Sequence, residues 1–117
     1  MRGDEERVIA AFCQWLRDRG WVPEREVGFA DVVAARGEER LVAEAKGRTQ
    51  AVGLDVDSCY GQLLRRISDE GDPCTRYALV VPEAGRAAAL RVSPRVRALL
   101  GITVYVVSDS GQVDEIT

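Results

Sequence analysis

The residue types that could carry out phosphate chemistry gather in the first half of the chain, at Asp31, Glu44 and Lys46. Lys46 is the sole lysine among 16 basic residues, and all the others are arginines. Carboxylate oxygens are preferred ligands of Mg²⁺, and a lysine ammonium is a compact charge that fits beside a phosphate or a water molecule. The chain has no histidine, which excludes Ser-His-Asp and Cys-His catalysis. Any catalysis would therefore use carboxylates, the lysine and a hard metal ion.

These three residues fall on two predicted strands, over residues 29–36 and 40–46, which are joined by a turn at 37–39. Side chains alternate across a strand, so Glu44 and Lys46 point to one face, roughly 7 Å apart along it. With residue 36 opposite residue 40, residue 32 lies opposite Glu44; a shift of one residue places Asp31 there instead. The hairpin thus brings two carboxylates and an ammonium together where apolar side chains would be expected.

Two interpretations of this arrangement are open. In the first, Asp31 and Glu44 bind a divalent metal ion and the carbonyl of Ala45 adds a further ligand. Lys46 then holds, or helps to deprotonate, the water that attacks a phosphodiester. In the second, the charged side chains form an exposed cross-strand ion pair on a solvated face, worth under about 1 kcal/mol. The strand context and the sole lysine favour the metal site.

Hydrophobic periodicity predicts an α/β fold around a mixed sheet, in the order α-β-β-β-α-β-α-β. The first three strands are expected to form an antiparallel meander, and the later, continuously apolar strands are expected to be buried on both faces. The predicted elements are a helix over 4–19, strands over 21–27, 29–36 and 40–46, a helix from Asp55 or Asp57 to 67, a turn at 69–73, a strand over 77–81, helices over 84–92 and 94–100, a strand over 102–107 and a short edge strand over 112–116.

Residues on the predicted helices extend the list of site candidates. Glu5 projects onto the apolar stripe of the first helix, as a residue turned toward a site would; the alternative is a solvated carboxylate that complements the helix dipole. Gln62 shares a helix flank with Arg66, so Gln62 could orient water or substrate and Arg66 could touch a phosphate, or both lie on a solvated face. Arg48, just beyond the lysine strand, is a further candidate phosphate contact. A basic surface, or an ordinary solvated helix, would account for Arg86, Arg91, Arg95 and Arg97.

Composition bounds the class of protein. With 117 residues, 46% hydrophobic and 30% charged, the chain is expected to form one globular domain over residues 1–117. Its apolar runs are too short to cross a membrane, and its polar N-terminal residues do not resemble a secretory signal, so a cytoplasmic location is expected. The three cysteines form no CxxC pair, which argues against zinc. The net charge of −3 gives no global signature of nucleic-acid binding, but it does not exclude a nuclease with acidic site residues.

The residues resemble the PD-(D/E)xK nuclease superfamily, also called restriction-endonuclease-like, over nearly the whole chain. Its αβββαβ core carries an acidic residue on the second strand and (D/E)xK on the third. Asp31 matches the metal-binding aspartate, and residues 44–46 match (D/E)xK. Glu5 matches the first-helix glutamate of many members, including archaeal Holliday-junction resolvases, and Gln62 is similar to a helix glutamine of several branches, with the resolvase and RecB-like branches nearest in pattern. Ala30 stands where the name-giving proline would be.

The resemblance implies a three-layer sandwich with an extra helix and a C-terminal strand, in a Mg²⁺- or Mn²⁺-dependent nuclease that cuts DNA. No separate DNA-reading domain is predicted, so specificity would come from DNA structure, a homodimer or a partner protein. Two alternatives remain open. One is a nonenzymatic binding or assembly subunit of a larger DNA-processing or defence complex, and the other is a dimeric junction resolvase.

Overall fold

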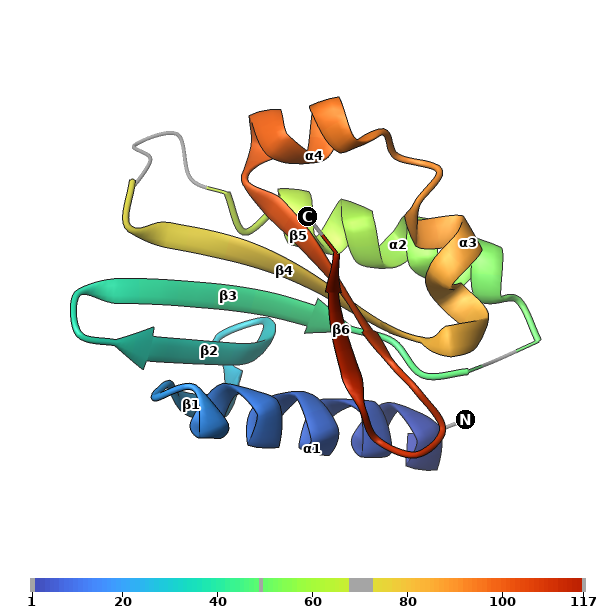
Figure 1. Cartoon of the computed structure of the whole chain (residues 1–117). Helices are drawn as coiled ribbons and strands as arrows, with labels where there is room; N and C mark the ends of the chain where they lie inside the picture. Colours follow the sequence, from blue (N-terminus) through green and yellow to red (C-terminus); the bar gives the residue numbers. More distant parts are fainter. Residues whose placement is uncertain (1, 49, 68–72, 117) are drawn as a thin grey trace.

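The sheet is the frame that positions the candidate residues. The computed structural model describes residues 2–48, 50–67 and 73–116, and within these residues six strands form one sheet in the order β1-β2-β3-β4-β5-β6 (Figure 1). The strands are β1 (Val22–Val27), β2 (Ala30–Arg36), β3 (Glu39–Ala45), β4 (Thr75–Pro82), β5 (Ile102–Val107) and β6 (Val113–Ile116). The helices are α1 (Arg2–Asp18), α2 (Val52–Leu64), α3 (Arg86–Ala89) and α4 (Pro94–Leu100), with a 3₁₀ turn η1 (Glu83–Gly85) before α3. The mixed α/β class and the order of the main elements are confirmed.

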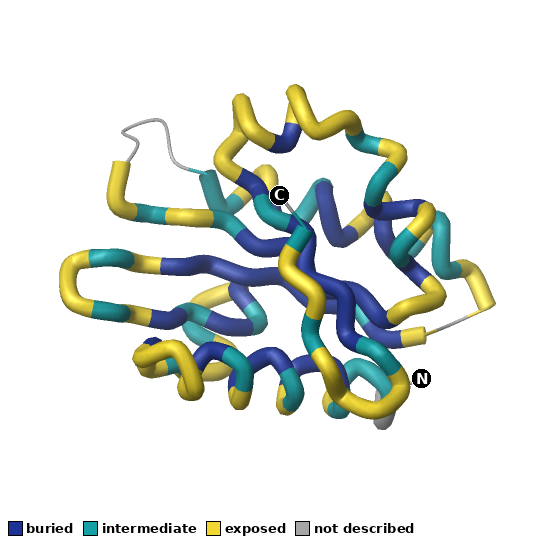
Figure 2. The backbone as a smooth tube through the Cα atoms, viewed as in Figure 1, coloured by how far each residue is buried: buried dark blue, intermediate teal, exposed yellow. Residues whose placement is uncertain are grey.

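The sheet is antiparallel at both sides and parallel in its centre. β1, β2 and β3 form an antiparallel meander, as predicted. β3, β4 and β5 are parallel, and β6 returns antiparallel to β5. The parallel strands carry the most continuous burial, whereas the outer strands and the hairpin ends are exposed (Figure 2). Burial on both faces explains why the central strands have nearly continuous apolar sequences.

Helices pack against both faces of the sheet (Figure 1). On one face, the apolar stripe of α1, centred on Phe12, packs against the small residues Ala43 and Ala45 of β3. On the other face, Leu63 of α2 packs with Leu79 of β4 in a second core. Because side chains alternate along a strand, successive residues of β3 meet these two different environments.

The β2–β3 hairpin has a two-residue turn, which fixes its register. Arg36 pairs with Glu39, and Gly37 takes φ +61° at the first turn position, where a type II′ hairpin needs a positive φ. The predicted pairing of residue 36 with residue 40 assumed one more turn residue and was wrong by one. Following the observed register along the hairpin places Asp31 opposite Glu44.

The start of α2 also differs from the prediction. The helix begins at Val52, earlier than Asp55 or Asp57, and its N-cap Ala51 makes no side-chain cap hydrogen bond. Val52 packs against the core on that face, so tertiary packing supports the first turn where capping does not. Residues 69–72 of the predicted turn at 69–73 lie outside the described residues.

The helical segment between β4 and β5 is shorter than predicted. The expected helix over 84–92 is the η1 turn followed by only four residues of α3. Gly85, where the η1 turn meets α3, is buried against Val81. α4 has the predicted caps: the Ser93 hydroxyl accepts a hydrogen bond from the N–H of Val96, and Gly101 ends the helix with φ +69°. Among the described residues, no helix is long and apolar enough to cross a membrane.

Candidate functional site

Asp31 and Glu44 lie side by side on β2 and β3, on the sheet face that α2 covers. Ala43 and Ala45 pack against α1, so Glu44 between them points to the opposite face. Glu44 is only 2% exposed, whereas Asp31 is half-buried. The N–H of Ala45 donates to Oδ2 of Asp31 at 2.8 Å. The fold therefore brings together the two carboxylates that the sequence paired.

The backbone ladder opens around Asp31. The last backbone-paired residues of β2 and β3 are Val32 and Ala43. Beyond them, the N–H of Ala45 donates to the side-chain carboxylate of Asp31 instead of to the β2 backbone. The N–H and C=O of one strand residue point to the same side, so the Ala45 carbonyl faces this opening as well. On the β1 side, the residue opposite Asp31 is Glu26, whose φ of +56° is uncommon outside glycine. The opening puts the Ala45 carbonyl on the same side of β3 as Asp31.

Arg66, in the turn just after α2, forms an ion pair with Glu44. Its Nε donates to Oε1 of Glu44 at 3.0 Å, and its second nitrogen donates to the Phe29 carbonyl at 3.1 Å. Burial, followed by the neighbouring Asp31 carboxylate, raises the pKa of Glu44 to about 7, against the lowering effect of Arg66. A cation beside Glu44, whether a guanidinium or a metal ion, favours its charged form.

Glu5 and Lys46 lie within electrostatic reach of this pair. Burial raises the pKa of Glu5, the Asp31 charge raises it further, and the Lys46 charge lowers it. The start of α1 lies very close to the chain just after β3: a Cβ added at Gly47 would overlap the backbone of Asp4 and Glu5. Glu5 therefore lies near the carboxylates and the lysine, half-buried at the first turn of its helix.

Gln62 lies on α2, and Arg48 lies shortly after the end of β3. Gln62 is half-buried in the last turn of α2, four residues before Arg66, which lies in the turn that follows the helix. Arg48 is exposed just beyond β3, and its N–H donates to the Asp4 carboxylate. Both positions are compatible with the predicted roles, which stay predictions.

Sequence reasoning missed residues that support the site. Asp4 ties the segment after β3 to α1, accepting hydrogen bonds from the N–H of Arg48 and from the Arg7 side chain; its place in the first turn of a helix was the available signal. Cys59 is 0% exposed, and its pKa is raised by burial and then by the Glu44 charge. Its position on the apolar stripe of α2 gave no sign of the nearby carboxylates, and the protonated thiol acts as a small apolar group.

A basic surface, one of the two alternatives for Arg86, Arg91, Arg95 and Arg97, does not form as a set. Arg97 is 4% exposed, and its Nε donates to a backbone carbonyl at 3.1 Å. Arg86 pairs with two carboxylates, at 2.5 and 2.7 Å. Arg91 and Arg95 are exposed. Burial takes the guanidinium of Arg97 off the surface, and ion pairing offsets the charge of Arg86.

The donor set fits a divalent cation. Asp31, Glu44 and the Ala45 carbonyl offer three oxygens from neighbouring strands, and Mg²⁺ keeps several water ligands. In the part of the chain that the structure describes, no three His, Cys, Asp or Glu side chains are grouped closely enough to hold a metal ion by themselves. Glu5 therefore does not complete a side-chain cage, and a cation at Glu44 would replace its hydrogen bond to Arg66.

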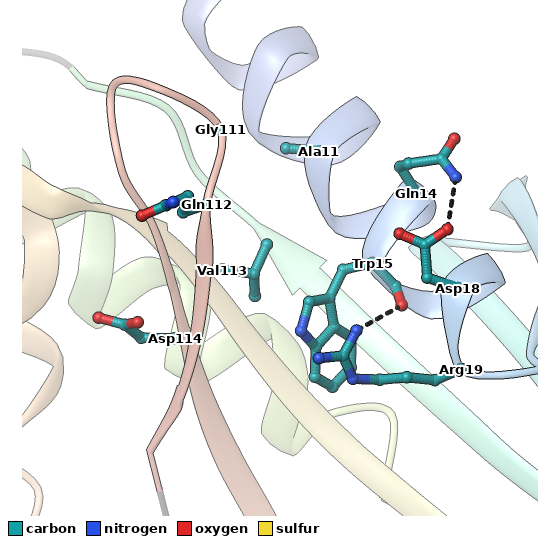
Figure 3. Close-up of a pocket in the computed structure, with 9 residues that line it drawn as sticks. All are labelled: Ala11, Gln14, Trp15, Asp18, Arg19, Gly111, Gln112, Val113 and Asp114. Atoms are coloured by element: carbon teal, nitrogen blue, oxygen red, sulfur yellow. Dashed lines mark hydrogen bonds between the residues drawn. The ribbon is translucent and has the colours of Figure 1, made fainter.

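A separate hollow of about 580 Å³ lies on the α1 side of the sheet (Figure 3). It is lined by the second half of α1 and by the segment from Gly111 to Asp114. The Arg19 guanidinium lies 3.9 Å from the centre of the Trp15 ring there. None of the candidate carboxylates, nor Lys46, lines this hollow, which is therefore distinct from the candidate site.

The architecture is that of a mixed α/β protein with helices on both faces of one sheet, and it is shared with solved structures. An XisH family protein from Nostoc punctiforme superposes with a TM-score of 0.63 and 16% identity, over 95% of this chain and 99% of that chain. An FdxN element excision controlling factor protein from Anabaena variabilis superposes with a TM-score of 0.65 and 15% identity, over 96% of this chain and 99% of that chain. At this identity the similarity establishes the fold alone. No protein-family model matches the chain, and no curated protein matches its sequence.

Proposed function

We propose that the chain is a divalent-metal-dependent nuclease that hydrolyses DNA phosphodiester bonds, and that its fold is the restriction-endonuclease-like three-layer sandwich. The observation that carries the proposal is the β2–β3 register, which puts Asp31 opposite Glu44, with Lys46 directly after the end of β3. A chance ion pair on a solvated face would not bury Glu44 to 2% exposure, because buried carboxylates are costly. The resemblance to the PD-(D/E)xK pattern supports the same conclusion.

The position of each residue suggests its role. Asp31, Glu44 and the Ala45 carbonyl would hold Mg²⁺ or Mn²⁺, and Glu5 would add to the negative field that attracts the ion. When bound, the ion supplies Lewis-acid activation of the phosphate and of water. Lys46 holds the attacking water and offsets charge that builds up on the phosphate.

The polar residues that flank the carboxylates are assigned to substrate binding. Gln62 orients water or substrate from α2, and Arg48 contacts a backbone phosphate. Arg66 is the resident cation at Glu44; a metal ion bound there would displace its guanidinium, which would then be free to pair with a phosphate. This exchange accounts for both its ion pair with Glu44 and its proposed contact with DNA.

Cleavage assays test the proposal. Linear, single-stranded and four-way-junction DNA would be incubated with the protein in Mg²⁺, Mn²⁺ or EDTA, beside Lys46→Ala and Asp31→Ala. We expect cleavage with either metal, none in EDTA and none by the two variants. Leu99→Ala is a matched control, because Leu99 is 76% exposed on α4. Cleavage that survives both site substitutions would contradict the assignment.

The second candidate is a nuclease-like subunit that binds DNA or a protein without cutting. Its supporting observation is that Glu44 is already paired with Arg66 and has no third acidic side chain grouped with it and Asp31 among the described residues. One protein of the same fold is described as an excision controlling factor, so control of DNA excision by binding is the form this alternative takes. DNA binding without cleavage of any substrate would favour it.

A dimeric junction resolvase is the third candidate. Glu5, which matches the first-helix glutamate of such enzymes, lies near Asp31 and Lys46. This alternative predicts a symmetric dimer in sedimentation experiments and selective cutting of four-way junctions. A monomer that cuts linear DNA equally well would exclude it.

A further inference from the structure

A cavity of about 250 Å³ adjoins the carboxylate pair on the same face of the sheet. Its floor includes Val33, Val42 and Tyr77, which are neighbours across β2, β3 and β4. Val33 lies two residues from Asp31, and Val42 lies two residues from Glu44, so each pair shares one face of its strand. The floor of the cavity therefore continues directly toward the two carboxylates.

The walls of the cavity combine aromatic and arginine side chains. Phe29, in the β1–β2 turn, is 86% exposed, more than any other large apolar side chain of the described residues. Arg66 lies between Glu44 and the cavity, with its guanidinium carbon 5.6 Å from the centre of the Phe29 ring. Arg40 also lines the cavity, and no acidic residue is among its described lining residues. The two arginines suit an anionic ligand, and the exposed Phe29 ring suits a ligand with an aromatic group.

We propose that this cavity binds one unpaired nucleotide of a DNA strand, with its base stacked on Phe29 and a phosphate held by Arg40, to which Arg66 would add a second contact once a metal ion displaces it from Glu44. The inference rests on the proposed nuclease function, because it places the nucleotide next to Asp31 and Glu44. Stacking on aromatic side chains combined with arginine–phosphate contacts is how proteins bind single strands. A base inside a duplex reaches such a cavity only after leaving its stack, at a cost of a few kcal/mol. The preferred substrate is therefore single-stranded DNA or DNA with an extrahelical base.

Binding in EDTA tests the cavity without cleavage. Fluorescence anisotropy would compare a labelled single-stranded oligonucleotide with the same sequence as a blunt duplex. We expect the native protein to prefer the single strand, Phe29→Leu to weaken that binding roughly tenfold and Phe29→Tyr to preserve it, because tyrosine still stacks. Arg40→Gln should weaken binding and reduce its salt dependence by about one phosphate contact, whereas Leu99→Ala should bind as the native protein does.

The outcomes separate the cavity from the nuclease proposal. No measurable single-strand binding, tighter binding of the duplex or equal affinity of Phe29→Leu and native protein would each overturn the cavity assignment. A dimer that Phe29→Leu dissociates would assign the cavity to a second copy of the chain and overturn it as well. Single-strand binding through Phe29 without metal-dependent cleavage would support the cavity and reject the nuclease. Cleavage by a protein whose binding ignores Phe29 would do the reverse.

Discussion

Successive residues of β3 meet an apolar core on one face of the sheet and a charged cluster on the other. Toward α1, Ala43 and Ala45 leave room for a packed aromatic group, in which the Phe12 ring lies 6.1 Å from Trp15 and 4.9 Å from Tyr105. Toward α2, the residue between these alanines is Glu44, beside a second carboxylate and a guanidinium. One strand thus carries an apolar core on one side and the proposed chemistry on the other.

The two faces differ in how closely a helix covers them, which leaves room for charged groups on one face only. α1 runs along the sheet and buries Phe12 completely. α2 packs on β4 but leaves a cavity over β2 and β3, where charged groups remain within reach of solvent. Substitutions in the α1-side core should therefore change stability with little effect on metal binding, whereas substitutions of the charged residues on the α2 side should change metal binding or cleavage most.

The largest effect is expected from the α1 side. Phe12→Ala should lower the free energy of unfolding by about 4 kcal/mol, because it removes a fully buried ring from an aromatic group. Urea titration measures the change. Mn²⁺ affinity of the folded fraction should stay within about twofold of native, and a larger loss would show that the two faces are coupled.

On the other face, Lys46→Arg should reduce cleavage at least about 100-fold, equivalent to about 3 kcal/mol of activation free energy. Arginine keeps the charge but cannot place a compact ammonium at the water. Single-turnover cleavage rates measure the loss, with the urea midpoint as a check on folding. A variant that cuts at the native rate would reduce Lys46 to an ordinary charged residue.

Gly47→Ala tests the contact that joins the two faces. Because the added Cβ overlaps the backbone of Asp4 and Glu5, we expect a loss of about 2 kcal/mol in unfolding free energy. Gly61→Ala is the matched control: Gly61 lies inside α2 with nothing within 4 Å of its added Cβ, so that variant should gain up to about 1 kcal/mol. Equal effects of the two substitutions would contradict the close approach of α1.

The pH dependence of stability sharpens the contrast at Glu44. Its pKa is raised from 4.5 to about 7, mainly by burial. A raised pKa means that the stabilising contribution is complete below about pH 4.5 and is lost as the pH rises through 7. In EDTA, the free energy of unfolding of the native protein should therefore fall by on the order of 2 kcal/mol between pH 5 and 8. The Glu44→Gln variant should not show this decrease. Urea titrations at several pH values measure it, with the exposed Glu6→Gln as control; parallel profiles for Glu44→Gln and native protein would contradict it.

The smallest effect concerns the competition for Glu44. Arg66→Gln removes the resident cation, so Mn²⁺ should bind roughly fivefold to tenfold more tightly, a gain of about 1 kcal/mol. Isothermal titration calorimetry measures the affinity, and the neighbouring exposed Arg65→Gln is the matched control. Weaker binding by Arg66→Gln would mean that Arg66 organises the site instead of competing with the ion.

Local sequence patterns predicted the elements and the pairing of Asp31 with Glu44, because both depend on short-range periodicity and one turn. The register was one residue out, since the choice between a two- and a three-residue turn depends on backbone geometry at Gly37. The start of α2 was missed because packing of Val52, not a capping side chain, determines it.

Contacts between distant elements could not be derived in this way. The ion pair of Arg66 with Glu44 depends on how α2 is rotated and placed on the sheet. The burial of Arg97 depends on the path of the chain after α3, which leads a backbone carbonyl to its guanidinium. Neither arrangement has a signal in the spacing of residues along the chain.

The outer strands of the sheet have a consequence for self-association. β1 carries Pro23, which lacks an N–H, and the left-handed Glu26, while β6 is only four residues long. Edges of this kind resist pairing with a strand from another molecule. A continuous sheet across two copies is therefore disfavoured, and a dimer of this chain would have to form through helices or through an open face of the sheet.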